Sequence, residues 1–526
     1  MAAAMGSGQR IINSRNPFFR ALIFATFCLG LFVLTLQPST TRIEQIQQNL
    51  DTYTASHPVD QTFVPDCSVN GSHLQQLQEK FKLDDKVEYA KRYIKFTRKD
   101  IERKSITKID EPLFPESFEK INIRTPPRTA ECLKPLEVEV PNSPFPETAD
   151  ASDLLFGIST TYGRLHDEHI GPMREWAHWL TDGHGNSNGA GLILRLIDAS
   201  DEEIEHSRMV MEKMGIDVKV YHSDSQIEMA QRYLSLLPAL YEDPRRETRK
   251  WLVMCDDDTF FPSMHGLLNQ LDTYDSSTEL YIGTLSEDIN QVQRHGSQAF
   301  GGAGVFFSIP LAKKVASFYD ECSTPDKLRE ANTGWGAQGD VLLRKCIYEH
   351  SEVRLTLLRS LYQLDLVTDV SGFYESGGKP LSLHHFKGGM WHTAFPNQYS
   401  QIAHTCGEDC IFQRFQTKDD FIITNGYSVA YYPKGIDFNV NQMERTFNSA
   451  PSDLGWNLDF MLGPQRQTLI ESGRKAAWDL KEAKVEADGS VRQMYIRKKD
   501  DWRWRESING KAMYDIDGVL ELIWIP

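Results

Sequence analysis

A repeated change of hydrophobic pattern constrains the fold of this chain most strongly. From about Asp153 onward, short apolar runs such as residues 192–197 (LILRLI) alternate with stretches of helical pattern. One such stretch runs from Ser200 to Gly215, and the Ser200–Glu203 spacing is typical of a capping box at a helix start. Strands that alternate with helices predict an α/β fold, with a mostly parallel sheet that is flanked by helices on both faces.

Three adjacent aspartates follow one of the predicted core strands. Residues 251–255 (WLVMC) form an apolar run, and Asp256, Asp257 and Asp258 come directly after it. Two unit charges about 4 Å apart repel by roughly 4 kcal/mol at an effective dielectric near 20. The cluster must therefore be solvated, partly protonated or bridged by a cation. A solvated turn is one interpretation, but we favour a divalent cation site, because open α/β sheets bind ligands at the carboxyl ends of their strands.

The composition restricts the class of partner. The chain has 526 residues, and 73 acidic residues against 57 basic ones give a formal net charge of −16. A broad basic surface for non-specific nucleic-acid binding is therefore not expected. No GxGxxG motif follows a strand and no GxxxxGK[ST] motif occurs, so dinucleotide-binding and P-loop folds lose their main support.

The first part of the chain predicts a membrane anchor. Residues 17–37 contain an apolar run that is preceded by arginines and followed by acidic residues. Twenty helical residues span about 30 Å, the thickness of a hydrocarbon core. The positive-inside rule leaves residues 1–16 in the cytoplasm and the rest in the lumen, as in a single-pass type II protein. A cleaved signal peptide is the alternative.

The remaining chain divides into three expected parts. Residues 38–150 are expected to form a luminal stem, because their proline-rich span extends more readily than it packs. A catalytic domain over residues 151–410 and a smaller β-rich accessory region over residues 411–526 follow. In an oxidising lumen, Cys406 and Cys410 are expected to form a disulfide rather than a zinc site, and Cys255 to stay free.

Four further stretches carry residues of the kind that binding sites use. They are GISTTYGRL (157–165), FGGAGVFFS (300–308), NTGWGAQGDVLLRKC (332–346) and LSLHHFKGGMWH (381–392). Glycines allow a backbone to approach a ligand closely, and histidines beside a cation site favour ligation. Each stretch also has a structural interpretation: a tight turn, a helix cap or a packing histidine.

In this order and at these intervals, DDDTFF, FGGAGVFFS, GDVLLRKC and LSLHHF resemble the fringe-like branch of glycosyltransferase family 31, of the fungal and plant type. The resemblance covers roughly residues 153–435. It implies a GT-A fold, a UDP-sugar donor, Mn²⁺, and an inverting transfer of a hexose or N-acetylhexosamine that commonly forms a β1,3 linkage. It also implies a Golgi membrane protein whose luminal domain acts on a glycan or glycoprotein acceptor.

The resemblance also implies roles for single residues. Asp258 would ligate the metal with His384 or His385, of which His384 is preferred. Asp256 and Asp257 would orient the ribose or complete the metal site through water. Asp340 would be the catalytic base, although the family's usual acidic pair reads Gly339–Asp340 in this chain. The donor and acceptor pocket would include Thr160, Thr161, Arg164, Gly301, Gly302 and Trp335.

The residue types fit this chemistry independently of the family. Carboxylates with one imidazole suit Mn²⁺, which can neutralise the charge of a leaving diphosphate. Inversion needs one base on the opposite side of the anomeric carbon, and Asp340 could supply it. One alternative is a non-enzymatic luminal chaperone or lectin of the same fold, which would be expected to lose the metal acids or the base. A second is a metal-dependent phosphohydrolase, which would need more metal ligands.

Overall fold

The computed structural model describes residues 65–526, except 115–117, 132, 449–461, 471–473 and 507–509. The expected cytoplasmic tail, the expected membrane anchor at residues 17–37 and the first part of the expected stem lie outside the described residues. Within the described part of the chain, we find no helix whose length and apolar character would suit a membrane span.

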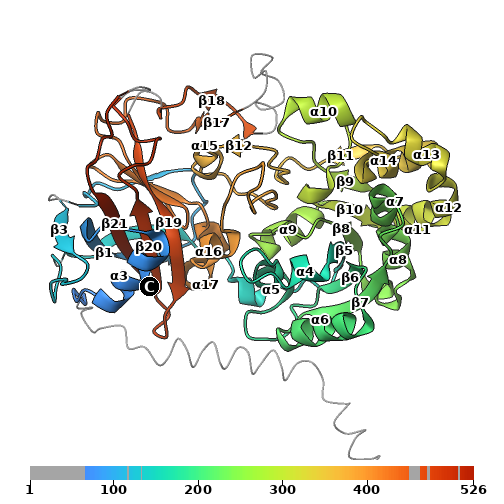
Figure 1. Cartoon of the computed structure of the whole chain (residues 1–526), viewed down its shortest axis with the longest axis horizontal. Coiled ribbons are helices and arrows are strands. Elements are labelled where there is room, and N and C mark those ends of the chain that lie inside the picture. The colour runs from blue at the N-terminus through green and yellow to red at the C-terminus, as the bar shows by residue number, and fades with distance from the viewer. Residues whose placement is uncertain (1–64, 115–117, 132, 449–461, 471–473, 507–509) are drawn as a thin grey trace, which may run out of the picture. The chain divides into compact units, whose positions relative to one another are not determined.

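A seven-stranded sheet forms where the α/β alternation is predicted (Figure 1). In spatial order its strands are β11 (Leu355–Leu357), β9 (Tyr281–Gly283), β10 (Val305–Ser308), β8 (Trp251–Met254), β5 (Leu154–Thr161), β6 (Gly191–Ile197) and β7 (Asp217–Ser223). β5 pairs in parallel with β6 and β8, and β6 with β7, as predicted. β10 runs antiparallel to both neighbours, so the sheet is mixed. A four-residue apolar run does not encode its direction.

Helices cover both faces of this sheet. One face packs against α5 (Met173–Leu180), α6 (Asp201–Lys213) and α9 (Met264–Leu271), and the other against α7 (Met229–Leu234), α8 (Leu236–Glu242), α11 (Ile309–Ser317) and α14 (Gly339–His350). Successive residues of β5 face opposite sides, since Leu155 packs in one core and Phe156 in the other. The predicted capping box of α6 is confirmed: Ser200 and Glu203 each accept a hydrogen bond from the other's backbone N–H.

Shorter elements connect these layers. They are α4 (Tyr162–Leu165), α10 (Ile289–His295), α12 (Tyr319–Cys322), α13 (Pro325–Glu330), α15 (Ser371–Tyr374), α16 (Pro396–Ser400) and α17 (Ala403–Cys406). Two small two-stranded sheets pair β12 (Val367–Thr368) with β17 (Phe447–Asn448), and β16 (Met443–Glu444) with β18 (Gln465–Arg466).

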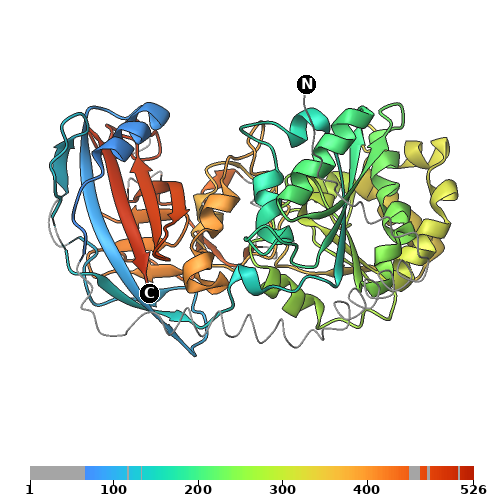
Figure 2. The ribbon, with the colours of Figure 1, turned by 90° about the horizontal axis from the view of Figure 1, so that it is seen from below.

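A second sheet has ten strands and joins segments from both ends of the described chain. Its strands are β1 (Lys86–Lys99), β2 (Thr107–Lys108), β3 (Glu119–Asn122), β4 (Leu136–Pro141), β13 (Arg414–Gln416), β14 (Phe421–Thr424), β15 (Ser428–Tyr431), β19 (Ala476–Val485), β20 (Val491–Arg497) and β21 (Asp517–Ile525). β1 lies beside β21 in parallel, from Val87↔Asp517 to Lys95↔Ile525. Figure 2 shows this blue strand next to the red C-terminal strands.

Residues 65–150 therefore differ from the extended stem that we expected. Helix α3 (Gly71–Phe81) and strands β1 to β4 pack into the second sheet, and side chains such as Ile94 and Val138 are fully or almost fully buried. The region after residue 411 is β-rich, as expected, but its sheet is larger than the seven-stranded one. Because β1 pairs with a strand near the other end of the chain, the local pattern could not reveal this arrangement.

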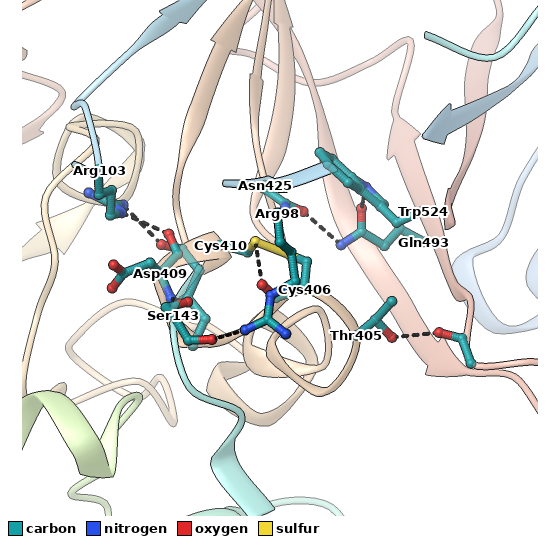
Figure 3. The surroundings of a disulfide bond; sticks show 12 residues. Arg98, Arg103, Ser143, Thr405, Cys406, Asp409, Cys410, Asn425, Gln493 and Trp524 are labelled. Atoms are coloured by element: carbon teal, nitrogen blue, oxygen red, sulfur yellow. Dashed lines mark hydrogen bonds between the residues drawn. A yellow bond between two sulfur atoms is a disulfide. The ribbon is translucent and has the colours of Figure 1, made fainter. Parts of the chain in front are cut away.

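Both predictions about the cysteines are confirmed. Cys406 and Cys410 form a disulfide, and buried Cys255 is free. A second disulfide, Cys322–Cys346, was not predicted. Figure 3 shows how the Cys406–Cys410 turn is anchored: Arg103 donates a hydrogen bond of 2.8 Å to the carbonyl of Asp409, and Thr405 donates one of 2.8 Å to the carbonyl of Gly489.

Candidate active site

One backbone bridge brings the acidic triplet to the two histidines. The N–H of Phe260 donates to the carbonyl of Leu383 at 2.9 Å, and the N–H of Leu383 donates to Phe260 at 2.8 Å. The triplet ends two residues before Phe260, and His384 follows Leu383 directly. The pairing therefore places both motifs at the same edge of the seven-stranded sheet, where β8 ends.

The glycine-rich motif is tied to the same bridge. The hydroxyl of Thr259 donates to the carbonyl of Gly302 at 2.8 Å, and the hydroxyl of Ser382 donates to the carbonyl of Ala303 at 2.7 Å. Both hydroxyls are buried with their residues, so each bond also satisfies a group that water does not reach. The DDDTFF, FGGAGVFFS and LSLHHF motifs are thus joined at one edge of the seven-stranded sheet.

Asp258, His384 and His385 form a cluster that could hold a metal ion, since one ligand atom from each lies within 4.8 Å of the others. His384 Nε2 lies 3.1 Å from Asp258 Oδ1 and 3.4 Å from Oδ2 of half-exposed Asp256. His384 Nδ1 lies 3.1 Å from the carbonyl of Gln363. Because a carbonyl can only accept, Nδ1 carries the proton there, as in a metal ligand whose other nitrogen is held by the backbone.

The charges of Asp258 and His384 are coupled to each other. Burial disfavours ionisation of both Asp258 and His384, but each charge stabilises the other, with Asp256 adding to the effect on His384. The pKa of Asp258 therefore lies below its usual range and the pKa of His384 well above it. Two carboxylates that face one nearly fully buried imidazole fit Mn²⁺ by their donor chemistry.

His385 is held from two other sides. Its Nε2 lies 2.9 Å from Asp365 Oδ1, and its ring stacks on Trp391 with 4.4 Å between ring centroids. Asp365 is itself buried and accepts a hydrogen bond from the hydroxyl of Ser286. The backbone φ of His385 is +54°, which is unusual for a residue other than glycine. His384 is thus the histidine that faces Asp256 and Asp258 most directly.

Gly301 and Gly302 lie between His384 and Asp340, the expected base. A Cβ on Gly302 would lie 2.1–2.3 Å from three atoms of the His384 ring. A Cβ on Gly301 would lie 2.5 Å from the Tyr233 hydroxyl and 2.9 Å from Asp340 Oδ1. Side chains at these two positions would displace the groups that line the site, which explains why the motif carries glycine at both.

Asp340 is the second residue of α14 and is half-buried beside Gly301 and Tyr233. Burial of its carboxyl group, together with the charge of Asp256, raises its pKa to about 7. Hydrogen bonds with the backbone of Gly301 and the hydroxyl of Tyr233 lower the pKa of Asp340, but by less than burial and Asp256 raise it. Such a pKa is suited to a group that accepts a proton near neutral pH.

The missing first acid of the Gly339–Asp340 pair has a structural reason. A Cβ on Gly339 would lie 2.7–2.8 Å from Cβ, Cγ and Cδ1 of Tyr233. The aromatic ring of Tyr233 therefore takes the space that a larger side chain at position 339 would need. The two positions are coupled in this chain.

Asp257 has a different environment from its two neighbours. Its carboxylate is buried, accepts two hydrogen bonds from Arg164, of 2.6 and 2.7 Å, and a third from the hydroxyl of Thr160. The pKa of Arg164 is raised, mainly by this pairing. Thr161 caps α4 by accepting from the N–H of Arg164 at 3.2 Å. Asp257 thus holds Arg164, while Asp256 and Asp258 face His384.

Trp335 does not join this cluster. Its side chain is 67% exposed, and the guanidinium of Arg294 lies 3.8 Å from its ring centroid.

Lys387 was not singled out from the sequence. Its buried Nζ has no hydrogen-bond partner among the described residues, and its charge interacts with Asp257 and Asp258. Its place two residues after His385, in the same motif, was the available signal.

Comparisons with known proteins agree with the motifs. Residues 197–401 match the family model described as Fringe-like. The chain is 30% identical over 197 residues to the beta-1,3-N-acetylglucosaminyltransferase radical fringe of Xenopus laevis, which covers 35% of this chain and 53% of that protein. The chain therefore spans about half the length of this curated relative.

Solved structures show only a weak likeness. Mouse xyloside xylosyltransferase 1, in its apo form, shares 11% sequence identity with this chain at a TM-score of 0.24. The match covers 39% of this chain and 84% of the mouse protein's chain. The galactosyltransferase LgtC, in complex with donor and acceptor sugar analogues, is 11% identical with a TM-score of 0.27 and covers 39% and 74%. Scores this low do not define the fold. Residues 197–401 of this chain are fringe-like, which confirms the resemblance that the motifs indicated.

Proposed function

We propose that this chain is a metal-dependent glycosyltransferase of GT-A type. It transfers a hexose or N-acetylhexosamine from a UDP-sugar to a glycan or glycoprotein, with inversion at the anomeric carbon and a β1,3 linkage. The observation that carries the proposal is the convergence of Asp256, Asp258 and His384 on one point, with Asp340 beyond the Gly301–Gly302 turn.

Asp258 and His384 would hold Mn²⁺, with Asp256 as a further oxygen donor. When bound, the ion would neutralise the negative charge that develops on the leaving diphosphate. Arg164 and Lys387 would add positive charge on the same side. Arg164 is already oriented by its two hydrogen bonds to Asp257, and a buried amine without a partner, such as that of Lys387, is stabilised by an anion.

Asp340 would act as the base of the transfer. Its carboxylate takes the proton of the acceptor hydroxyl while the acceptor oxygen bonds to the anomeric carbon and the bond to UDP breaks. The raised pKa of Asp340, about 7, makes this carboxylate a stronger base than an exposed aspartate. Gly301 leaves room for this carboxyl group, because any side chain at that position would contact it.

The compartment is also part of the proposal. The described disulfides, Cys322–Cys346 and Cys406–Cys410, suit an oxidising lumen. Together with the anchor expected at residues 17–37, they support a type II Golgi membrane protein whose catalytic part faces the lumen.

The test is a panel of UDP-sugars, each incubated with the purified full chain and Mn²⁺ in detergent, with UDP release as the readout. We expect at least one donor to be turned over, and turnover to stop when EDTA is added. Asp340→Asn should keep donor binding and lose turnover. Donor binding without any turnover by the wild-type chain would instead favour the lectin or chaperone alternative.

A further inference from the structure

A cavity of about 430 Å³ lies outside the cluster of candidate metal ligands and base. Its lining comes from three parts of the chain: residues 368–370, the segment from His392 to Tyr399 at the end of the histidine motif, and the strands of the ten-stranded sheet with their loops. Its volume falls within the range of about 300–1,000 Å³ that is usual for small-molecule sites.

Both exposed and buried aromatic side chains line this cavity. Trp502 and Phe395 are 62% and 47% exposed, which is unusual for such large apolar groups. Tyr427 is buried in the wall. Exposed flat rings next to hydrogen-bonding groups are suited to a ligand that has one apolar face and a polar edge, which is the character of a sugar ring.

A buried carboxylate is built into the cavity wall. Asp369 is 7% exposed, and its Oδ1 accepts a hydrogen bond of 2.9 Å from the N–H of Ser371. Its Oδ2 has no hydrogen-bond partner among the described residues. Arg503 Nη1 lies 3.7 Å from Asp369 Oδ1, so this buried carboxylate helps to hold the guanidinium of Arg503 in the cavity wall.

The charges of the lining are balanced. Two carboxylates, Asp369 and Asp479, stand against two cations, Lys481 and Arg503. Arg503 Nη2 donates to Asp479 Oδ2 at 2.7 Å, so this pair is already neutralised within the wall. A cavity of this composition does not favour a strongly anionic ligand, and its donors and acceptors match a neutral polyhydroxyl compound.

A short hairpin connects this cavity to the histidines. Lys387 and Thr393 form an antiparallel bridge, and the N–H of Ala394 donates to the carbonyl of Phe386 at 2.8 Å. The first arm of the hairpin follows His385 directly. The second arm contributes Thr393 and leads to Phe395, both in the cavity wall. A ligand in the cavity and a ligand at the metal cluster would thus contact the same hairpin.

We propose that this cavity is a glycan-binding subsite that holds a neutral sugar residue of the acceptor. That the bound glycan is the acceptor rests on the proposed transferase function, whereas sugar binding itself does not. The ligand's ring stacks on Trp502 and Phe395, and its hydroxyls accept hydrogen bonds from Lys481 and Arg503.

The test measures sugar binding without donor or metal. The full chain is immobilised in detergent with EDTA, and lactose, maltose, cellobiose and N,N′-diacetylchitobiose are passed over it by surface plasmon resonance. We expect saturable binding of at least one disaccharide, weakened at least tenfold by Trp502→Ala and by Phe395→Ala. Tyr221→Ala, which removes an exposed aromatic side chain from β7, is the matched control and should bind like the wild type.

Two outcomes overturn the inference: no disaccharide binds the wild type, or Trp502→Ala binds as tightly as the wild type. Because Trp502 is exposed, its replacement is not expected to prevent folding, and the melting temperature checks this. The assay contains no donor, so it also separates the two proposals. Sugar binding without UDP-sugar turnover would overturn the transferase proposal alone, and turnover without sugar binding would overturn the subsite alone.

Discussion

Phe260 and Leu383 exchange two backbone hydrogen bonds, of 2.9 and 2.8 Å, and this bridge sets the position of the whole candidate site. It places the acidic triplet, which precedes Phe260, beside His384, which follows Leu383. The aspartates therefore meet the imidazole through the pairing of two segments that are distant in sequence. The arrangement is thus built into the pairing of the backbone.

Replacement of Gly302 by alanine should damage the metal site. The added Cβ would lie 2.1–2.3 Å from the His384 ring, which is nearly fully buried and cannot move away freely. We expect at least a tenfold loss of Mn²⁺ affinity and an overpacking cost of about 1–3 kcal/mol in the free energy of unfolding. Calorimetry and thermal melting measure the two effects. Gly163→Ala is the control, because its Cβ would meet nothing within 4 Å.

Gly339 and Tyr233 should behave as a coupled pair. Gly339→Glu, which restores the family's usual first acid, would collide with the Tyr233 ring at 2.7–2.8 Å. We expect this variant to lose at least tenfold in kcat/KM, equivalent to about 1.4 kcal/mol. In the double variant Tyr233→Ala/Gly339→Glu, part of the loss should be recovered. Strictly additive effects in the double-mutant cycle would show that the two positions are independent.

The pH dependence of transfer should follow Asp340. Only its deprotonated form can accept a proton, and its pKa is raised to about 7 by burial and by the charge of Asp256. A cation at Asp256 offsets the second cause, so kcat/KM should rise with pH to a midpoint at or below about 7 and then level off. Initial rates between pH 5 and 9, with the donor and acceptor held constant, measure this profile. A rate that is flat from pH 5 to 8 contradicts the assignment of Asp340 as base.

The same group makes a prediction about stability. Without metal, the unfolded chain loses the Asp340 proton near its ordinary pKa of 3.8, whereas the folded chain keeps it until about 7. The unfolded state then binds fewer protons, so this group's contribution to stability falls as pH rises between these values. Asp340→Asn removes that loss. Its melting temperature in EDTA, relative to the wild type, should therefore be higher at pH 8 than at pH 4.

The features that the sequence predicted are those that local pattern determines. The strand–helix alternation, the capping box at Ser200 and the Cys406–Cys410 bridge each depend on residues close together in the chain. The proximity of the aspartates to His384 was inferred from the family resemblance. The composition of the motifs alone could not establish it, because it arises from the Phe260–Leu383 bridge.

The features that the sequence did not reveal depend on long-range packing. The parallel pairing of β1 with β21 joins segments that a local pattern cannot relate, so residues 65–150 resembled a stem. The engagement of Asp257 by Arg164 likewise follows from where β5 and β8 end side by side. Lys387 stands in a recognised motif, but only its buried, unpartnered amine distinguishes it from an ordinary surface lysine.

Binding of Mn²⁺ to the full chain, measured by electron paramagnetic resonance in the presence of UDP, tests whether Asp258 and His384 hold the ion. We expect one tightly bound Mn²⁺ per chain, lost in Asp258→Asn and in His384→Ala but retained in Asp340→Asn. Equal Mn²⁺ binding by the wild type, Asp258→Asn and His384→Ala would contradict this assignment, because the cation would then lie elsewhere.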